Sequence, residues 1–286
     1  MLTQGTQLLD VANSHNFAVP AFNISDYAMF KGVMEISEEL DAPVIIAIHP
    51  DEYSHVGRAF MYAVRQRAYE SSVPVTIHWD HGADHDQFLT AAQVGFTSMM
   101  IDASLEEFDR NVEITSQVVR SAHVLGIPVE GELGTIGKLD EEAEQGASEI
   151  IYTRPEDAVR FVELTQVDSL AIAIGTSHGL YPSSLRPELK QELLSQIKEA
   201  LRIPLVLHGG SNNPDEEIAE AVRRGVNKIN ISSDIKAAYH QRMREVLADP
   251  KVREPNTIQP ASLDAMKEVA AHKIDLFQAA GKAKLY

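Results

Sequence analysis

The chain has 286 residues, of which 44% are hydrophobic, and it carries a formal net charge of −17. This length suits one large domain, and no apolar run approaches the length of a membrane-spanning helix. The acidity, without any local cluster of Lys and Arg, argues against a nucleic-acid partner. Cysteine is absent, which excludes disulfides and thiolate metal sites, and the N-terminus lacks a basic region followed by an apolar core. We therefore expect a cytoplasmic enzyme with neither a nucleic-acid nor a membrane partner.

Short apolar runs alternate with amphipathic helical patterns along the chain, and the runs are typical of strands buried on both faces of a parallel sheet. The eight runs are Ala18–Asn23, Pro43–His49, Pro74–Asp80, Ser98–Asp102, Val129–Glu132, Ser169–Ile174, Pro204–His208 and Lys228–Ser233. The predicted helices are Tyr27–Leu40, Arg110–Leu125, Pro155–Thr165, Pro187–Leu201, Pro214–Arg224, Ile235–Val246 and Ser262–Ala279, and His85 is expected to open a further helix. This alternation predicts one α/β domain over residues 1–286, a (β/α)8 barrel of the TIM type.

Two predicted connections, Gly134–Thr153 and Gly175–Arg186, are longer than a barrel requires. Long loops on a compact barrel are usually functional. The first loop carries Asp140 and Glu141, and a loop that closes over a substrate could deliver such a carboxylate as a general base. The alternative is a solvated acidic surface loop.

Histidines stand at or just past the ends of three predicted strands. His81 follows the third run, His178 follows the sixth, and His208 closes the seventh. Because barrel enzymes place their active sites at the C-terminal ends of the strands, these imidazoles are expected to meet at one mouth. Three histidines with one open position are the pattern of a catalytic zinc, so the sequence predicts a zinc site.

Neighbouring residues could support this site. Asp80 directly precedes His81, and we expect one of the two to face the mouth and the other the turn. His78 is expected to be a hydrogen-bonded core histidine. Glu132 closes the fifth run, with Glu130 two residues earlier on the same face. One of these glutamates could be an alternate metal ligand or could orient a histidine, and the alternative is a carboxylate paired inside the barrel.

A phosphate site is expected at the other side of the mouth. Gly209-Gly210-Ser211 follows the seventh run, and residues 230–233 close the eighth run before a helix. Barrels frequently bind phosphate at these two loops, through backbone N–H groups and a helix N-terminus. The alternative is ordinary turn chemistry.

Motifs in one order along nearly the whole chain resemble the class II, metal-dependent ketose-bisphosphate aldolases, especially the tagatose-bisphosphate branch. The segments are VPAFNI (19–24), DHG (80–82), MIDAS (100–104), VEGELGTIG (129–137), VDSLAIAIGTSHGLY (167–181), PLVLHGGS (204–211) and KINISSD (228–234). The resemblance implies a zinc-dependent aldolase of the (β/α)8 fold. It would cleave a ketose 1,6-bisphosphate, or a related ketose 1-phosphate, to dihydroxyacetone phosphate and an aldehyde through an enediolate.

The resemblance also implies residue roles. His81, His178 and His208 match the zinc ligands, Glu132 matches a strand-end glutamate near the metal, and Asp80 matches the acid/base group at the C4 hydroxyl. Asp140 or Glu141 would be the loop base. The implied site for dihydroxyacetone phosphate consists of Asn23, Gly179, Gly209, Gly210, Ser211, Asn230, Ile231, Ser232 and Ser233. A monovalent cation, Na⁺ or K⁺, is implied beside it. We also expect a homodimer or homotetramer, with a non-catalytic companion subunit as a further partner.

Departures from the family pattern cluster around the aldehyde half of the substrate. The second run ends in His49 where fructose-bisphosphate enzymes help to hold phosphate, and the loop has Asp140 where glutamate is usual. The tail offers only Lys282 and Lys284 in place of an arginine. We therefore expect tagatose 1,6-bisphosphate to be accepted, with a ketose 1-phosphate, longer or lacking the second phosphate, as the better substrate.

Three other functions are considered. A Schiff-base aldolase needs a lysine inside the barrel. No predicted strand ends in lysine, and Lys228 stands at the start of the eighth run, where it is expected to lie on the wrong face. Another metal-dependent barrel enzyme, an isomerase or hydrolase, is a second alternative because fold does not fix function. The third is a non-catalytic subunit of an aldolase complex.

Overall fold

The computed structural model describes residues 1–139, 149–182 and 184–286. Eight parallel strands close into a barrel in chain order, with the last strand returning beside the first. The strands are β1 (Val19–Asn23), β2 (Val44–Ile48), β3 (Val75–Gly82), β4 (Ser98–Ile101), β5 (Val129–Leu133), β7 (Ser169–Ile172), β9 (Leu205–Leu207) and β10 (Val226–Ile231). Each strand overlaps one of the eight apolar runs, so the predicted (β/α)8 barrel is confirmed.

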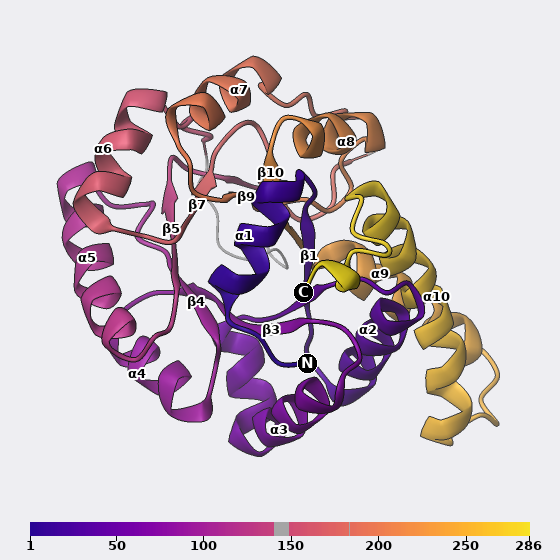
Figure 1. Ribbon diagram of the computed structural model, residues 1–286. Helices are drawn as coiled ribbons and strands as arrows, with labels where there is room; N and C mark the ends of the chain where they lie inside the picture. The colour runs from indigo at the N-terminus through magenta and orange to yellow at the C-terminus, as the bar shows by residue number, and fades with distance from the viewer. Residues whose placement is uncertain (140–148, 183) are drawn as a thin grey trace.

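The helices form a ring outside the strands (Figure 1). They are α1 (Gly5–His15), α2 (Tyr27–Glu39), α3 (Pro50–Glu70), α4 (His85–Val94), α5 (Phe108–Val124), α6 (Pro155–Thr165), α7 (Gln191–Ala200), α8 (Asp215–Arg223), α9 (Ser233–Val246) and α10 (Pro255–Leu276), followed by a short 3₁₀ turn, η1 (Ala283–Leu285). Every predicted helix is found, and α10 begins earlier than expected because Pro255 is tolerated in a first turn. Neither α1 nor α3 was predicted from the sequence.

The strands are buried on both faces, as the apolar runs indicated. All five residues of β2 (VIIAI) and all eight of β3 (VTIHWDHG) are buried. Outward-facing side chains of the strands pack against the helices, as Asn227 does by accepting from Lys198 of α7 at 3.0 Å. The charged side chains of Asp80, Glu130 and Lys228 lie inside the barrel, where they need partners. The polar chemistry of this molecule is therefore concentrated in the barrel interior and at its mouth.

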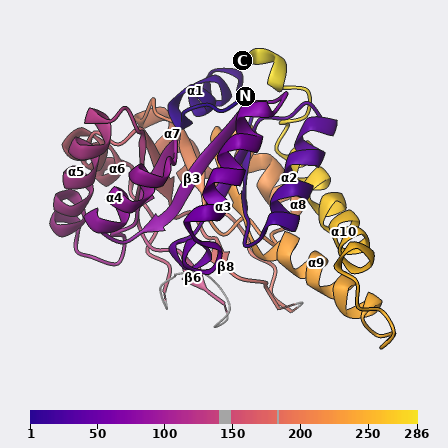
Figure 2. The ribbon, with the colours of Figure 1, turned by 90° about the horizontal axis from the view of Figure 1, so that it is seen from below.

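One end of the barrel is closed by α1 and by the C-terminal tail. The backbone N–H of Gly5 bonds to the carbonyl of Thr97, and a Cβ on Gly5 would lie 2.6 Å from Ser98 Oγ, so only glycine allows this approach. The hydroxyl of Tyr286 donates to the carbonyl of Leu8 at 2.7 Å. Figure 2 shows both termini at this end, opposite the C-terminal ends of the strands.

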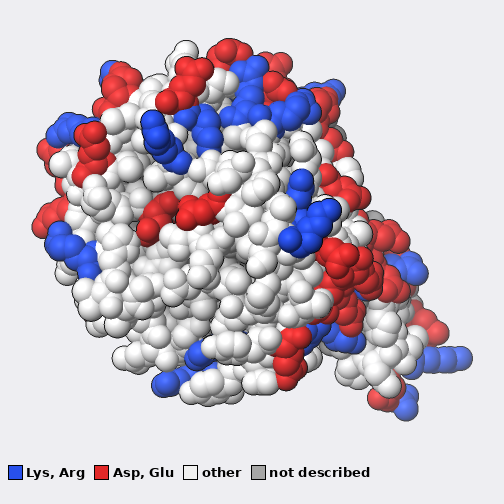
Figure 3. Space-filling view, in the orientation of Figure 1, with Lys and Arg blue, Asp and Glu red and all other residues white. Residues whose placement is uncertain are grey.

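The closed end carries charge of both signs (Figure 3). Lys and Arg gather mainly over α7 and α8, where Arg223 and Arg224 pair with Glu220, and Arg224 also pairs with Glu192. Acidic atoms therefore lie beside the basic ones. Among the helices in the described ranges, none is long and apolar enough to cross a membrane.

The two long connections contact each other at the open end. Gly137–Lys138 forms β6 and Ser177–His178 forms β8, and these two short strands pair in parallel. A Cβ on Gly137 would lie 2.3 Å from Ser177 Oγ, so glycine permits the pairing. Two loops without strands were expected here. The pairing matters because it positions His178.

Candidate active site

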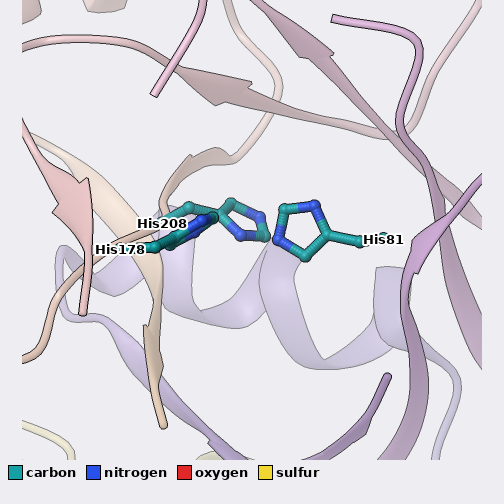
Figure 4. Close-up of side chains that lie close together, drawn as sticks. All are labelled: His81, His178 and His208. Carbon is teal, nitrogen blue, oxygen red and sulfur yellow. The ribbon is translucent and has the colours of Figure 1, made fainter. Parts of the chain in front are cut away.

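Three histidines from different parts of the barrel meet at its C-terminal mouth (Figure 4). His81 lies in β3, His178 in β8, and His208 directly after β9. The ring centroids are 4.5 Å apart for His81 and His208, and 5.2 Å apart for His81 and His178. One nitrogen of each ring lies within 4.8 Å of one nitrogen of the other two, and all three residues are buried. This arrangement can hold one metal ion.

Asp80 and His81 both reach the site, although we expected one of them to face the turn. Regular alternation would send these neighbours to opposite faces. β3 instead shifts its register against β4 between Trp79 and Gly82, and His81 has a left-handed backbone with φ +50°. Such irregularities re-aim side chains and are common at active sites. The expectation was wrong because it assumed an undistorted strand.

His81 is oriented by Asp102. The Nδ1 atom of His81 lies 2.8 Å from Asp102 Oδ2, and the backbone N–H of Ser104 donates to the other oxygen of Asp102. His81 Nε2 is buried and has no hydrogen-bond partner in the described part of the chain. Burial opposes protonation of His81, but the charges of Asp80 and Asp102 outweigh it and raise its pKa to about 10. An orphaned nitrogen in so negative a setting suits a cation.

His208 is oriented from its other nitrogen by Glu130. His208 Nε2 lies 2.7 Å from Glu130 Oε1, which leaves Nδ1 buried without a hydrogen-bond partner among the described residues. Burial, and then the charge of His81, lower the pKa of His208, so its neutral form is favoured. Burial opposes ionisation of Glu130, but Lys228 and His208 outweigh it and hold the pKa of Glu130 at about 2.

Lys228 lies inside the barrel, so the expectation that it sits on the wrong face is corrected. Its ammonium lies 2.7 Å and 3.0 Å from the two oxygens of Glu130 and 3.4 Å from His78 Nε2. The alternation of β10 puts Lys228 on the same side as Asn230, whose amide also points inward. His78 is buried and shares a 2.8 Å hydrogen bond with Ser98, as expected of a core histidine.

The carboxylate of Asp80 accepts hydrogen bonds from two side-chain amides. Asn23 Nδ2 donates to one carboxylate oxygen at 2.8 Å, and Asn230 Nδ2 donates to the other at 3.0 Å. Burial opposes ionisation, but the charge of His81, and to a smaller extent that of Lys228, hold the pKa of Asp80 well below its ordinary value. Asp80 is therefore an oriented, ionised carboxylate that can accept a proton.

Glu132 stands on the other side of His81. Burial and then the charge of Asp102 raise its pKa well above the ordinary value. His81, Asp102 and Glu132 form a second group whose ligand atoms lie within 4.8 Å of one another. The two glutamates of β5 thus serve different neighbours: Glu130 contacts His208, while Glu132 lies beside His81. Sequence reasoning left this choice open and gave no role to Asp102, although Asp102 closes the fourth run.

A small cavity adjoins the histidines at the ends of β9 and β10. It is lined by His178, Gly179, Gly209, Ser211, Asn230, Ser232 and Ser233. The hydroxyl of Ser211 accepts weakly from the backbone N–H groups of Ser232 and Asp234 at 3.3 Å. Gly210 and Ile231 do not line this cavity, and the amide of Asn23 is engaged by Asp80. Backbone and hydroxyl donors of this kind can bind a phosphate group.

The residues predicted around the aldehyde half of the substrate lie in different parts of the molecule. Asp140 and Glu141 lie outside the described residues. His49 begins α3 as its N-cap and lies beside His81, with 6.2 Å between ring centroids. Lys282 lies over the ring of Phe17, which precedes β1, and Lys284 lies in η1. Both lysines are thus at the closed end of their own barrel, away from the histidines.

Comparison with known proteins gives one family for nearly the whole chain. Residues 3–282 match the family described as class-II fructose-bisphosphate aldolase. A fructose-bisphosphate aldolase of Thermus caldophilus is 35% identical over 305 residues, covering 99% of this chain and 100% of that protein. The solved YdjI aldolase of Escherichia coli K12 is 34% identical, with a TM-score of 0.88 over 99% of this chain and 100% of that one. A fructose-bisphosphate aldolase of Campylobacter jejuni, 22% identical, shares the fold with a TM-score of 0.79 over 98% of this chain and 96% of that one.

Proposed function

The chain belongs to the class II fructose-bisphosphate aldolase family and is therefore a lyase. We propose that it is a zinc-dependent aldolase that cleaves a phosphorylated ketose to dihydroxyacetone phosphate and an aldehyde. The observation that carries the proposal is the meeting of three buried histidines beside an ionised aspartate. Histidine donors suit zinc, and orphaned nitrogens on His81 and His208 fit an ion between them. Zinc held by His81, His178 and His208 would act as a Lewis acid that stabilises the negative charge of the enediolate.

Asp80 would move the first proton. During cleavage it accepts the proton of the C4 hydroxyl, the C3–C4 bond breaks, C4 becomes the aldehyde carbon, and the bonding electrons stay on the three-carbon fragment. The hydrogen bonds from Asn23 and Asn230 fix the direction of the carboxylate, and the charge of His81 beside it favours its ionised form, as a general base requires. Protonation of C3 then completes dihydroxyacetone phosphate, and we assign that proton to Asp140 or Glu141. Glu132 stays a proposed alternate ligand beside His81.

The C1 phosphate is assigned to the cavity beside His178. The implied site comprises Gly179, Gly209, Gly210, Ser211, Asn230, Ile231, Ser232 and Ser233, with Asn23 nearby and a Na⁺ or K⁺ ion alongside. Gly210 lies behind the cavity lining, because its backbone N–H donates to the carbonyl of Asn230 at 3.2 Å and a Cβ there would meet Ile229 and Ile231. The N-terminus of α9 at Ser233 adds a favourable dipole for an anion.

The aldehyde half of the substrate is the less constrained end. Lys282 and Lys284 lie at the closed end of the barrel, so within one subunit they cannot neutralise a second phosphate at the mouth. This supports a ketose 1-phosphate as the preferred substrate, with tagatose 1,6-bisphosphate accepted. In a homodimer or homotetramer, a neighbouring subunit could supply the missing cation instead.

The rival functions explain less of the site. Lys228 is inside the barrel, but Glu130 and His78 surround its ammonium below the histidines, whereas a Schiff-base lysine must reach the substrate carbonyl. A non-catalytic subunit has no need of the complete set of Asp80 and three histidines. Borohydride with substrate should therefore fail to trap the protein, and trapping on Lys228 would overturn the metal mechanism.

The direct test is a cleavage assay with metal control. The purified protein is stripped with a chelator, restored with Zn²⁺, and assayed for dihydroxyacetone phosphate by coupled reduction. Substrates are tagatose and fructose 1,6-bisphosphates and ketose 1-phosphates of different lengths. We expect activity only with metal, and the highest kcat/KM for a 1-phosphate. Activity unaffected by chelation would refute the zinc proposal, and a strong preference for a bisphosphate would refute only the substrate proposal.

A further inference from the structure

A buried ion pair lies directly beneath the three histidines. Glu130 comes from β5 and Lys228 from β10, and each side chain is 1% exposed. The carboxylate of Glu130 receives both Lys228 Nζ and His208 Nε2. On the far side, Lys228 contacts His78, which is fixed by Ser98. The chain of contacts therefore runs across the barrel interior and ends on one proposed metal ligand.

Stability does not explain such a pair well. Removing two charges from water is costly, and well-packed apolar residues of similar volume often stabilise a fold as much or more. A buried pair is better explained where its geometry specifies something. Here one carboxylate accepts two donors whose positions are fixed by different strands, so it can set the direction of both.

We argue that the Glu130–Lys228 pair fixes the orientation of the His208 imidazole. A carboxylate at His208 Nε2 requires the ring proton there. The lone pair of Nδ1, which has no hydrogen-bond partner among the described residues, is then free for an ion shared with His81 and His178. His81 shows the opposite arrangement, because Asp102 binds its Nδ1 and leaves Nε2 toward the centre. Two ligands thus present different nitrogens, and a different carboxylate selects each one.

Lys228 in turn fixes the carboxylate. Its ammonium contacts both oxygens of Glu130, at 2.7 Å and 3.0 Å, and so restricts rotation of the carboxylate. An ammonium has three donors, and His78 Nε2 at 3.4 Å lies near the third. Without Lys228, the carboxylate would lose its orientation and its counter-charge together.

We propose that Glu130 and Lys228 are positioning residues that set the metal affinity of the site by fixing His208 with Nδ1 toward the ion. The inference rests on the proposed metal site and goes beyond it, since neither residue is among the proposed ligands. Groups that orient metal-bound histidines typically change metal affinity by about 10–100-fold when removed.

The experiment measures Co²⁺ binding to the metal-free protein by visible absorption. The variants are Glu130→Gln, which is nearly isosteric, Lys228→Met, and the double variant. We expect each single variant to bind Co²⁺ about 10–100-fold more weakly than the parent. The double variant should regain thermal stability, because it leaves no unpaired charge, while its Co²⁺ affinity stays low. The matched control is Lys273→Met, which breaks another largely buried pair, with Asp234 at 2.9 Å, and should lower stability without changing Co²⁺ affinity.

A second measurement reports orientation directly. Long-range ¹H–¹⁵N spectra of the metal-free protein should show the proton of His208 on Nε2 in the parent, and a mixture of tautomers or altered shifts in Lys228→Met. Failure of the parent to bind Co²⁺ would refute the metal site itself. Normal Co²⁺ affinity and an unchanged His208 spectrum in folded Glu130→Gln and Lys228→Met would refute the positioning role and leave the metal site standing.

Discussion

At the scale of single residues, the site depends on buried polar side chains whose orientation is fixed by hydrogen bonds to other side chains. Asp80 is gripped by Asn23 and Asn230, and His81 and His208 are each turned by a carboxylate. Buried polar groups are tolerated when they are fully paired, and this pairing also fixes their direction. His81 Nε2 and His208 Nδ1 are buried and find no hydrogen-bond partner among the described residues, so they indicate where a ligand would bind.

Replacement Asp80→Asn tests the proposed base. Asparagine keeps the shape but cannot accept a proton, so turnover should fall by about 10²–10⁴-fold. Zinc content, measured on the purified variant by elemental analysis, should equal that of the parent because Asp80 acts on a proton. Loss of zinc in proportion to activity would show instead that Asp80 supports the metal.

Replacement Gly209→Ala tests the proposed phosphate site. Gly209 has φ +63°, and a Cβ there would lie 2.7 Å from the carbonyl oxygen of Ser177. We expect the variant to lose about 2–4 kcal/mol of unfolding free energy, from backbone strain and overpacking together, and to have a raised KM. Gly57→Ala is the control, since Gly57 has φ +72° with nothing within 4 Å of its added Cβ. Equal losses in urea unfolding would mean that strain alone matters at Gly209.

The strand-end residues were predictable because position after an apolar run depends only on local pattern. His81, His178 and His208 are found this way. The partners of Glu130 and Lys228 were not, because they depend on how far β5, β9 and β10 are offset around the barrel. No single run contains that information.

At the scale of elements, the structure contains short strands and a polar helix that the sequence pattern did not predict. β6 and β8 have two residues each, too few to show a period, and their pairing is long-range. α3 buries only Glu52, Met61, Val64 and Ala68 among its 21 residues, so its apolar stripe is weak in the sequence. The same helix is attached to α2 by Arg67, which donates to both oxygens of Glu38.

The Arg67–Glu38 pair gives a pH prediction. Burial opposes ionisation of Glu38, but its hydrogen bonds with Arg67 outweigh it and lower its pKa from 4.5. As pH falls, Glu38 is therefore protonated in the unfolded state before it is protonated in the folded state. Its contribution to the free energy of unfolding is fully present above the unfolded-state pKa and is lost as pH falls through the lower folded-state pKa. Glu38→Gln should reduce unfolding free energy by about 1 kcal/mol at neutral pH, and the difference should vanish in acid.

The control for this pair is Glu113→Gln. Glu113 pairs with Arg110 on the surface, where the two side chains are 68% and 55% exposed, so no measurable change is expected. Urea unfolding of both variants and the parent across the acid range checks the prediction. A loss in Glu38→Gln that persists at low pH would assign the effect to packing rather than charge.

At the scale of the whole molecule, the proposed metal would join distant parts of the chain. His81, His178 and His208 come from β3, β8 and the end of β9. An ion that binds only the folded state adds stability in proportion to the logarithm of its concentration over its Kd, about 2.7 kcal/mol at a hundredfold excess. A chelator should therefore lower the Tm of the parent by several degrees, and should leave the Tm of His208→Ala unchanged. Equal Tm values for the parent with and without chelator would contradict this linkage.

The barrel keeps its two ends separate. Both chain termini lie beside α1, with Tyr286 bonded to Leu8, while the histidines open on the opposite side. An affinity tag or a flexible tether at either terminus would thus extend away from the mouth. Molecules tethered to a bead or sensor chip through such a tether would present their substrate entrance to the liquid, and turnover could be followed on the immobilised enzyme.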